Sequence, residues 1–189
     1  MIVMEVKRVS VFRKDYRDIC KLLCDSLPKE EHLPLPIMYL LSLRKDIHYF
    51  SFKDNNDLVG LMYTIETKEL DYLLYLAVNP NIRSKGYGSK MMEWLSFRSG
   101  KKPVALDIEA IEKDSDNYDQ RQKRLKFYEK NNFKQTGYTL NYNGKNFIIL
   151  ANNENFTKEA FVKLFQSFTF NLYKPKVKKI SEWSEICFS

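Results

Sequence analysis

Long apolar runs are missing from this sequence of 189 residues. No window approaches the roughly 18 apolar residues that a membrane-spanning helix needs, so we expect no membrane association. The first residues, MIVMEVKRVSVFRK, have neither the long apolar core nor the small-residue cleavage site of a signal peptide. These two absences indicate a cytoplasmic protein.

Cysteine and histidine are also scarce. The chain has three cysteines, and two of them, Cys20 and Cys24, are one helical turn apart, which indicates neither a disulfide framework nor a metal site. Neither of the two histidines, His32 and His48, has a second ligand at a recognisable spacing. We therefore predict no bound metal.

The composition that remains is that of a folded, basic protein. Hydrophobic residues make up 44% of the chain and aromatic residues 14%, which excludes a disordered chain. The formal net charge of +7 suits an anionic ligand, either coenzyme A or nucleic acid. Nucleic acid is the weaker alternative, because the basic residues are dispersed. The one cluster, Lys174–Lys179, is more typical of a solvated tail.

The stretch from Leu73 to Leu95 carries the clearest functional pattern. Leu73–Val78 is almost wholly apolar and predicts a buried strand, which Asn79-Pro80 ends. A loop with two glycines, Gly86 and Gly88, then leads into a helix that we expect to stop near Gly100. Glycines, free N–H groups and the positive end of a helix dipole together bind anions. We interpret this loop, with the cations Arg83 and Lys85, as a pyrophosphate cradle.

Two well-known phosphate loops do not fit this stretch. A Walker loop would need Gly-Lys-Ser/Thr, and a dinucleotide fingerprint would need a third glycine where Met91 stands. A plain strand-to-helix turn remains the simplest alternative. The pattern that is left, Arg-x-x-Gly-x-Gly after Leu-Ala-Val, resembles the GNAT superfamily of N-acetyltransferases. A second stretch, RLKFYEKNNF at 124–133, resembles that family's later helix-to-strand motif, with Asn132 where glycine is usual. The resemblance covers about residues 6–150.

The resemblance implies a fold and a co-substrate. The fold is mixed α/β (α+β): a mostly antiparallel sheet with two splayed parallel central strands, flanked by helices. The co-substrate is acetyl-CoA, whose pantetheine arm would pair with the backbone of the central strand and whose pyrophosphate would lie on the loop. The implied binding residues are Leu76, Ala77, Val78, Arg83, Ser84, Lys85, Gly86, Tyr87, Gly88 and Ser89.

The catalytic residues implied by the resemblance lie later in the chain. Strand 104–109, VALDIE, alternates strictly, so Asp107 and Glu109 share one face. Glu109 is nearer the strand's C-terminal end, where the thioester is expected, and is our predicted base. It would act directly or through a water, or anchor the ammonium. Tyr128 is the predicted acid for the departing thiolate, because a phenol is protonated at neutral pH. Its plainer interpretation is a core aromatic.

The rest of the chain is divided into expected elements. We predict a strand over 3–11, a helix over 13–27, a short helix over 37–43, and hairpins over 48–66 and 133–150. A final helix opens near Thr157. The predicted domains are an acetyltransferase domain at 1–152 and a C-terminal helix and tail at 153–189, packed on the domain or on a partner subunit.

The predicted function is direct transfer of an acetyl group from acetyl-CoA to a primary amine in a ternary complex. The acceptor is an unidentified small molecule or peptide, and a homodimer is an open alternative for the oligomeric state. The competing prediction is a non-catalytic acetyl-CoA-binding protein on the same fold, because fold does not fix function.

Overall fold

The computed structural model describes residues 4–27, 32–82, 85–142 and 144–180. It divides into two compact units, the first formed by Met1–Glu66 with Leu73–Leu95 and the second by Thr67–Tyr72 with Ser96–Ser189. The strands follow the order β1-β2-β3-β4-β5-β7-β6-β8, and β4 contributes residues to both units. Within the described ranges, no helix is long and apolar enough to cross a membrane.

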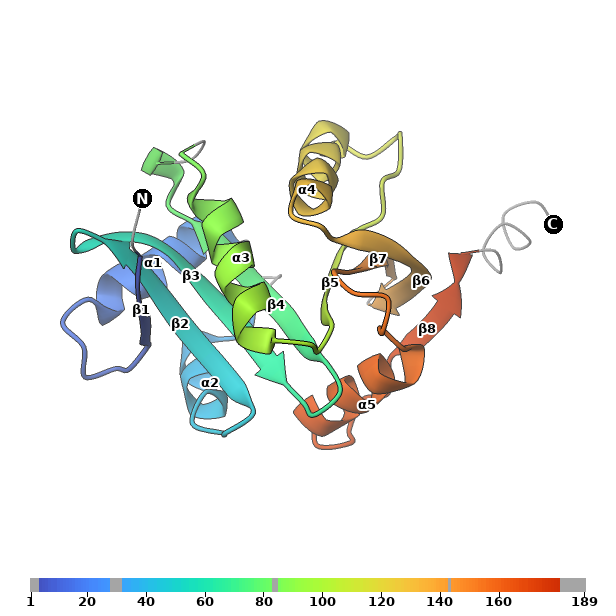
Figure 1. The fold of residues 1–189 in the computed structure, drawn as a ribbon, viewed down its shortest axis with the longest axis horizontal. Coiled ribbons are helices and arrows are strands. Elements are labelled where there is room, and N and C mark those ends of the chain that lie inside the picture. Colours follow the sequence, from blue (N-terminus) through green and yellow to red (C-terminus); the bar gives the residue numbers. More distant parts are fainter. Residues whose placement is uncertain (1–3, 28–31, 83–84, 143, 181–189) are drawn as a thin grey trace. The chain divides into compact units, whose positions relative to one another are not determined.

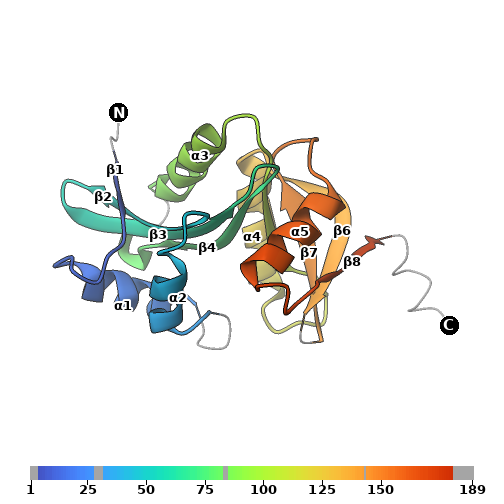
Figure 2. The same cartoon turned by 90° about the horizontal axis from the view of Figure 1, so that it is seen from below.

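The first unit is built on antiparallel strands. Its elements are β1 (Glu5–Arg8), β2 (Ile47–Asp54), β3 (Asp57–Glu66), most of β4 (Asp71–Val78), α1 (Tyr16–Ser26), α2 (Leu35–Leu41), the short 3₁₀ helix Pro80–Ile82 and most of α3 (Tyr87–Ser99). Helices α1 and α2 cover one face of these strands, and α3 covers the other (Figures 1 and 2). Trp94 of α3 packs its ring against Phe50 and Phe52 of β2, at centroid distances of 5.0 and 5.2 Å.

The second unit contains the sheet's parallel pair. Its elements are the start of β4, β5 (Val104–Glu109), α4 (Tyr118–Lys130), β6 (Lys134–Tyr142), β7 (Lys145–Ala151), α5 (Lys158–Phe168) and β8 (Lys176–Lys179). Asp71 and Tyr72 pair in parallel with Val104 and Ala105, and all other strand pairs of the unit are antiparallel. The predicted mixed α/β fold is therefore confirmed.

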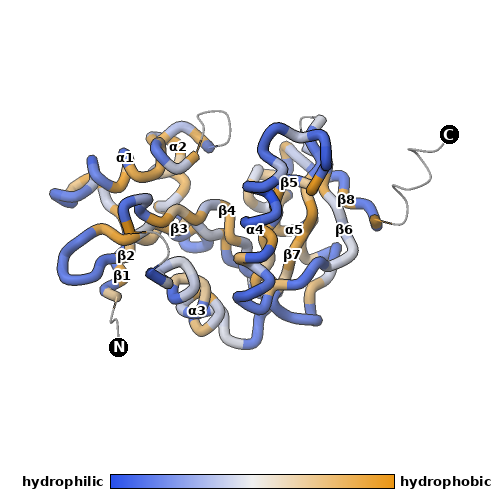
Figure 3. The backbone as a smooth tube through the Cα atoms, turned by 90° about the horizontal axis from the view of Figure 1, so that it is seen from above, coloured by the Kyte–Doolittle hydropathy of each residue, from blue (hydrophilic) through white to orange (hydrophobic). Residues whose placement is uncertain are grey.

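Hydrophobic residues concentrate on the strands, as the colouring of β4 and β7 shows in Figure 3. In β5 the alternation seen in the sequence is real, since Val104, Leu106 and Ile108 are buried while Asp107 and Glu109 are partly exposed. Each carboxylate therefore lies on the strand face opposite this apolar set. The strand's geometry alone does not distinguish the two carboxylates.

Most predicted elements are confirmed, with two corrections. The first strand was predicted over 3–11, and among the described residues of that range it covers Glu5–Arg8. The run Lys174–Lys179 was predicted as a solvated tail, yet Lys176–Lys179 form β8 and pair antiparallel with β6. The reason is Val177, which lies opposite Leu140 and is buried, while the neighbouring lysines face outward.

Candidate functional site

The predicted cradle begins where β4 ends, and its first turn is tied to β3. Asn79 donates its backbone N–H to the carbonyl of Val59 and its side-chain amide to the carbonyl of Leu58, at 3.0 and 2.9 Å. Its side-chain oxygen accepts from the N–H of Asn81 at 3.1 Å. This asparagine therefore directs the chain out of the strand and into the loop, as a turn-forming residue at that position was predicted to do.

The loop leads into α3 through a left-handed residue. Gly86 has φ = +83°, and a Cβ placed there would meet no atom within 4 Å. Lys90 donates its N–H to the carbonyl of Gly86. The N–H groups of Tyr87, Gly88 and Ser89 precede this first bonded donor and so have no acceptor within the helix. Such groups at a helix N-terminus bind anions.

The side chain of Tyr87, another residue of the cradle, anchors the start of α3. Tyr87 donates its hydroxyl to Asp54 Oδ2 at 2.7 Å, which ties the start of α3 to the end of β2. That hydrogen bond raises the pKa of Tyr87. Lys85 is exposed, whereas Arg83 and Ser84 lie outside the described residues.

One residue of this region was missed by the sequence reasoning. Gly60 of β3 lies where a Cβ would come 2.7 Å from the carbonyl oxygen of Ala77 and 2.6 Å from Met91 Sδ. Only glycine allows this approach of β3, β4 and α3. A glycine inside an otherwise apolar strand was the available signal.

Tyr128, the predicted acid, lies in the second unit near the end of α4. Its ring packs against Phe127 and Phe133, at centroid distances of 5.1 and 6.1 Å. Burial raises the pKa of Tyr128 to about 12, with a smaller opposing effect of Arg124 and a further increase from Asp107. The hydroxyl is therefore protonated at neutral pH, as the acid role requires.

The chain turns directly after Tyr128 as the motif predicted. Asn132 adopts φ = +67°, which confirms it as the left-handed residue in place of the usual glycine. Phe133 then donates its N–H to the carbonyl of Tyr128 at 3.0 Å. This closure fixes the last turn of α4, from which the tyrosine projects.

Glu109, the predicted base, is surrounded by donors. Its two oxygens lie 3.2 Å from Asn117 Nδ2, 3.5 Å from Arg121 Nη2 and 3.8 Å from Lys145 Nζ. Arg121 also donates to Asn117 Oδ1 at 2.7 Å and to the carbonyl of Ala110 at 2.6 Å. The carboxylate is thus part of a polar cluster that joins the link 110–117 to α4.

Asp107 lies on the same face of β5 in very different surroundings. Among the residues that the structure describes, its one hydrogen-bond donor is the hydroxyl of Tyr72, and it has no ion pair. Burial raises the pKa of Asp107 to about 6, although the Tyr72 hydrogen bond opposes the increase. The ring of Tyr72 in turn packs against Phe161 and Phe165 of α5, at 5.6 and 5.0 Å.

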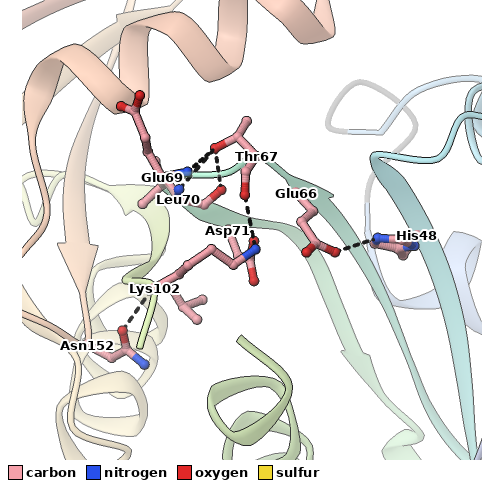
Figure 4. Close-up of polar contacts among 9 residues, drawn as sticks. His48, Glu66, Thr67, Glu69, Leu70, Asp71, Lys102 and Asn152 are labelled. Atoms are coloured by element: carbon pink, nitrogen blue, oxygen red, sulfur yellow. Dashed lines mark hydrogen bonds and ion pairs between the residues drawn. The ribbon is translucent and has the colours of Figure 1, made fainter. Parts of the chain in front are cut away.

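The buried side chains of Asp71 and His48 form polar pairs of their own (Figure 4). Lys102 Nζ binds Asp71 Oδ1 at 2.7 Å and the carbonyl of Thr67 at 3.0 Å, next to the parallel strand pair. In the first unit, Nε2 of His48 lies 2.9 Å from Glu66 Oε2. Nδ1 of His48 accepts from Arg8. No cluster of three or more metal-ligating side chains occurs in the part of the chain that the structure describes.

A mixed sheet, a glycine-containing loop between β4 and α3, and the α4 helix-to-strand motif together define a GNAT-type acetyltransferase fold. Residues 45–135 match the family model of the acetyltransferase (GNAT) domain. The match runs from just before β2 to the start of β6, and so includes the cradle, β5 and α4. None of the curated proteins matches the chain significantly.

Solved structures share this fold at low sequence identity. A GNAT-family acetyltransferase from Bacteroides thetaiotaomicron is similar with a TM-score of 0.71 and 19% identity, over 89% of this chain and 99% of that one. An Elizabethkingia anophelis GNAT acetyltransferase with acetyl-CoA bound is similar with a TM-score of 0.56 and 16% identity, over 78% of this chain and 96% of that one. The aminoglycoside 6'-N-acetyltransferase from Enterococcus faecium is similar with a TM-score of 0.60 and 17% identity, over 82% of this chain and 98% of that one.

Proposed function

We propose that this protein transfers an acetyl group directly from acetyl-CoA to a primary amine of a small molecule or peptide. The observation that carries the proposal is the cradle, in which a strand end, a left-handed glycine and the free N–H groups of α3 occur within the matched GNAT domain. A similar fold holds acetyl-CoA in the Elizabethkingia protein. The cytoplasm is the compartment proposed, and a homodimer stays an open prediction.

The cofactor contacts proposed for this chain follow the predicted set. The N–H groups of Tyr87, Gly88 and Ser89 donate to the pyrophosphate, with the cations Arg83 and Lys85 and the hydroxyl of Ser84 in support. Gly86 keeps the backbone open to the ligand. The backbone of Leu76, Ala77 and Val78 receives the pantetheine arm.

Three chemical tasks remain for the chain. An N–H near Val78 donates to the thioester oxygen as negative charge develops there. Tyr128 gives its proton to the departing thiolate, a role supported by its raised pKa. A carboxylate of β5 removes a proton from the acceptor, because an ammonium has no lone pair. Glu109 remains the predicted residue for that task, with the anchoring of an ammonium as its alternative.

Calorimetric titration with acetyl-CoA, with CoA and ATP as comparison ligands, tests the cradle. We expect micromolar binding of acetyl-CoA and much weaker binding of ATP. Gly86→Val should abolish binding, because its side chain would occupy the pyrophosphate's place. Gly137→Val is the matched control, since Gly137 has a similar φ of +79° and equally open surroundings but lies on β6. Retention of binding by Gly86→Val would refute the cradle.

Thiol release in the presence of candidate amines tests catalysis. Tyr128→Phe should lower turnover with little change in acetyl-CoA affinity, as expected for an interaction made in the transition state. Equal turnover would remove Tyr128 from the mechanism. Acetyl-CoA binding without thiol release for any amine would favour the non-catalytic alternative.

A further inference from the structure

The start of α3 follows a residue that does little to fix the direction of the helix. Gly86 has φ = +83°, and a Cβ placed there would meet no atom within 4 Å, so no side-chain packing occurs at this position. A hydrogen bond to an anion depends strongly on distance and angle. The free N–H groups of Tyr87, Gly88 and Ser89 therefore need another contact to hold the first turn of α3 in place.

The side chain of Tyr87 makes such a contact with the end of the β2–β3 hairpin. Its hydroxyl donates to Oδ2 of Asp54 at 2.7 Å. Asp54 is the last residue of β2 and pairs with Asp57, the first residue of β3. Asn55 and Asn56 between them have φ values of +48° and +72°, which is characteristic of the tight type I′ hairpin turn. Asp54 is therefore an anchor on a well-defined turn.

The same hairpin holds the chain before the loop and further along α3. Asn79, directly after β4, donates its backbone N–H to the carbonyl of Val59 and its side-chain amide to the carbonyl of Leu58. One helical turn after Tyr87, Met91 Sδ occupies the space that a Cβ on Gly60 would need. All of these residues lie within the first unit. The β2–β3 hairpin thus supports both ends of the loop between β4 and α3.

We propose that Asp54 is a positioning residue for acetyl-CoA, because it holds the first turn of α3 through the hydroxyl of Tyr87 and so aims the free N–H groups at the pyrophosphate. The inference rests on the proposed function and adds the β2–β3 hairpin to the parts of the chain that set the affinity for acetyl-CoA. Asp54 acts through Tyr87 and not through a contact of its own with the co-substrate.

The charge of Asp54 and its hydrogen bond should have opposite effects on the binding of an anion. A carboxylate near an anion site repels the anion, and Asp57 is a second acid at the same turn. The hydrogen bond to Asp54 raises the pKa of Tyr87, so the phenol keeps its proton and remains a donor at neutral pH. Loss of the charge alone should therefore not weaken the binding of acetyl-CoA, whereas loss of the hydrogen bond should weaken it.

Calorimetric titration of four variants with acetyl-CoA separates these two effects. Asp54→Ala should bind acetyl-CoA about 10-fold more weakly than the wild type, on the scale of one hydrogen bond to a charged group. Tyr87→Phe should show the same loss, because it removes the other partner of the bond. Asp54→Asn keeps an acceptor oxygen and should bind at least as tightly as the wild type. Asp57→Asn is the matched control, since it removes an exposed acid of the same turn and should not weaken binding.

Kinetics of amine acetylation should separate KM from kcat in the same variants. Asp54→Ala should raise KM for acetyl-CoA by about 10-fold and leave kcat at saturating acetyl-CoA unchanged, because the contact serves the ground state and the transition state alike. Wild-type affinity in Asp54→Ala, or an equal loss of affinity in Asp54→Asn, would overturn the role of Asp54 and leave the proposed function intact. Failure of the wild type to bind acetyl-CoA would instead overturn the proposed function and this inference with it.

Discussion

Asp107 and Glu109 lie two residues apart on one face of β5, yet they have opposite surroundings. Asp107 has one neutral donor, Tyr72, and aromatic rings beyond it. Glu109 has an amide and two cations within 4 Å. Burial therefore raises the pKa of Asp107. Glu109 instead holds the link 110–117 and α4 together through its contacts with Asn117 and Arg121. The comparison teaches that the elements packed against a strand, rather than the strand's own pattern, decide what its carboxylates can do.

The largest change in stability is expected from removing the aromatic ring of Phe161, which packs against Tyr72 beside Asp107. Phe161 is fully buried and contacts Tyr72, Phe156 and Phe165. Phe161→Ala should lower the free energy of unfolding by about 3–5 kcal/mol, through lost burial and the remaining cavity. Urea denaturation measures this. Phe97→Ala, at a residue 86% exposed, is the control and should change stability by less than about 0.5 kcal/mol. Equal effects of the two variants would mean that α5 does not cover Tyr72.

The next prediction concerns the burial of Asp107, which should make the free energy of unfolding depend on pH. Its pKa is raised from 3.8 to about 6, so the folded state binds the proton more tightly than the unfolded state. Tighter proton binding by Asp107 in the folded state adds up to about 3 kcal/mol to the free energy of unfolding below pH 4. This stabilisation is lost as the pH rises from 4 to 6. The variant Asp107→Asn has no carboxyl at this position and therefore lacks this pH-dependent stabilisation. The stability of this variant relative to wild type should therefore increase by about 2–3 kcal/mol between pH 4 and 7.

Denaturation midpoints at several pH values measure that difference. Glu109→Gln is the matched control for loss of a carboxylate, since Glu109 lies on the same strand β5 but has two cationic neighbours. A flat difference between wild type and Asp107→Asn would show that Asp107 is as well solvated as an ordinary aspartate.

Much of this arrangement was predictable from local patterns. Strand β4, helix α3, the paired strands of the two hairpins and the left-handed Asn132 all depend on residues close in sequence, and all are confirmed. The partner of Asp107 was not predictable in this way, because Tyr72 lies 35 residues away at the start of a different strand. Strand β8 was missed because four residues with three lysines carry almost no hydrophobic pattern. The role of Gly60 depends on tertiary packing against Ala77 and Met91.

A smaller change in stability is expected from removing the hydrogen bonds of Arg121 near Glu109. Arg121 makes hydrogen bonds to Asn117 and to the carbonyl of Ala110, besides its ion pair with Glu109. Arg121→Gln should lower the free energy of unfolding by about 1.5 kcal/mol, the scale of a charged hydrogen bond. Proteolysis within the link 110–117 should become faster. Lys123→Gln, an exposed residue of the same helix, should leave both measurements unchanged.

The smallest effect is expected at Lys145, the outermost neighbour of Glu109. Its Nζ lies 3.8 Å from Oε1, and its side chain is 61% exposed. Solvent screens such a pair, so Lys145→Ala should change the free energy of unfolding by less than about 0.5 kcal/mol. A double-mutant cycle with Glu109→Gln measures the coupling directly. A coupling above about 1 kcal/mol would mean that the end of β5 is shielded from water. The contrast with Asp107 would then rest on the cations beside Glu109 rather than on burial.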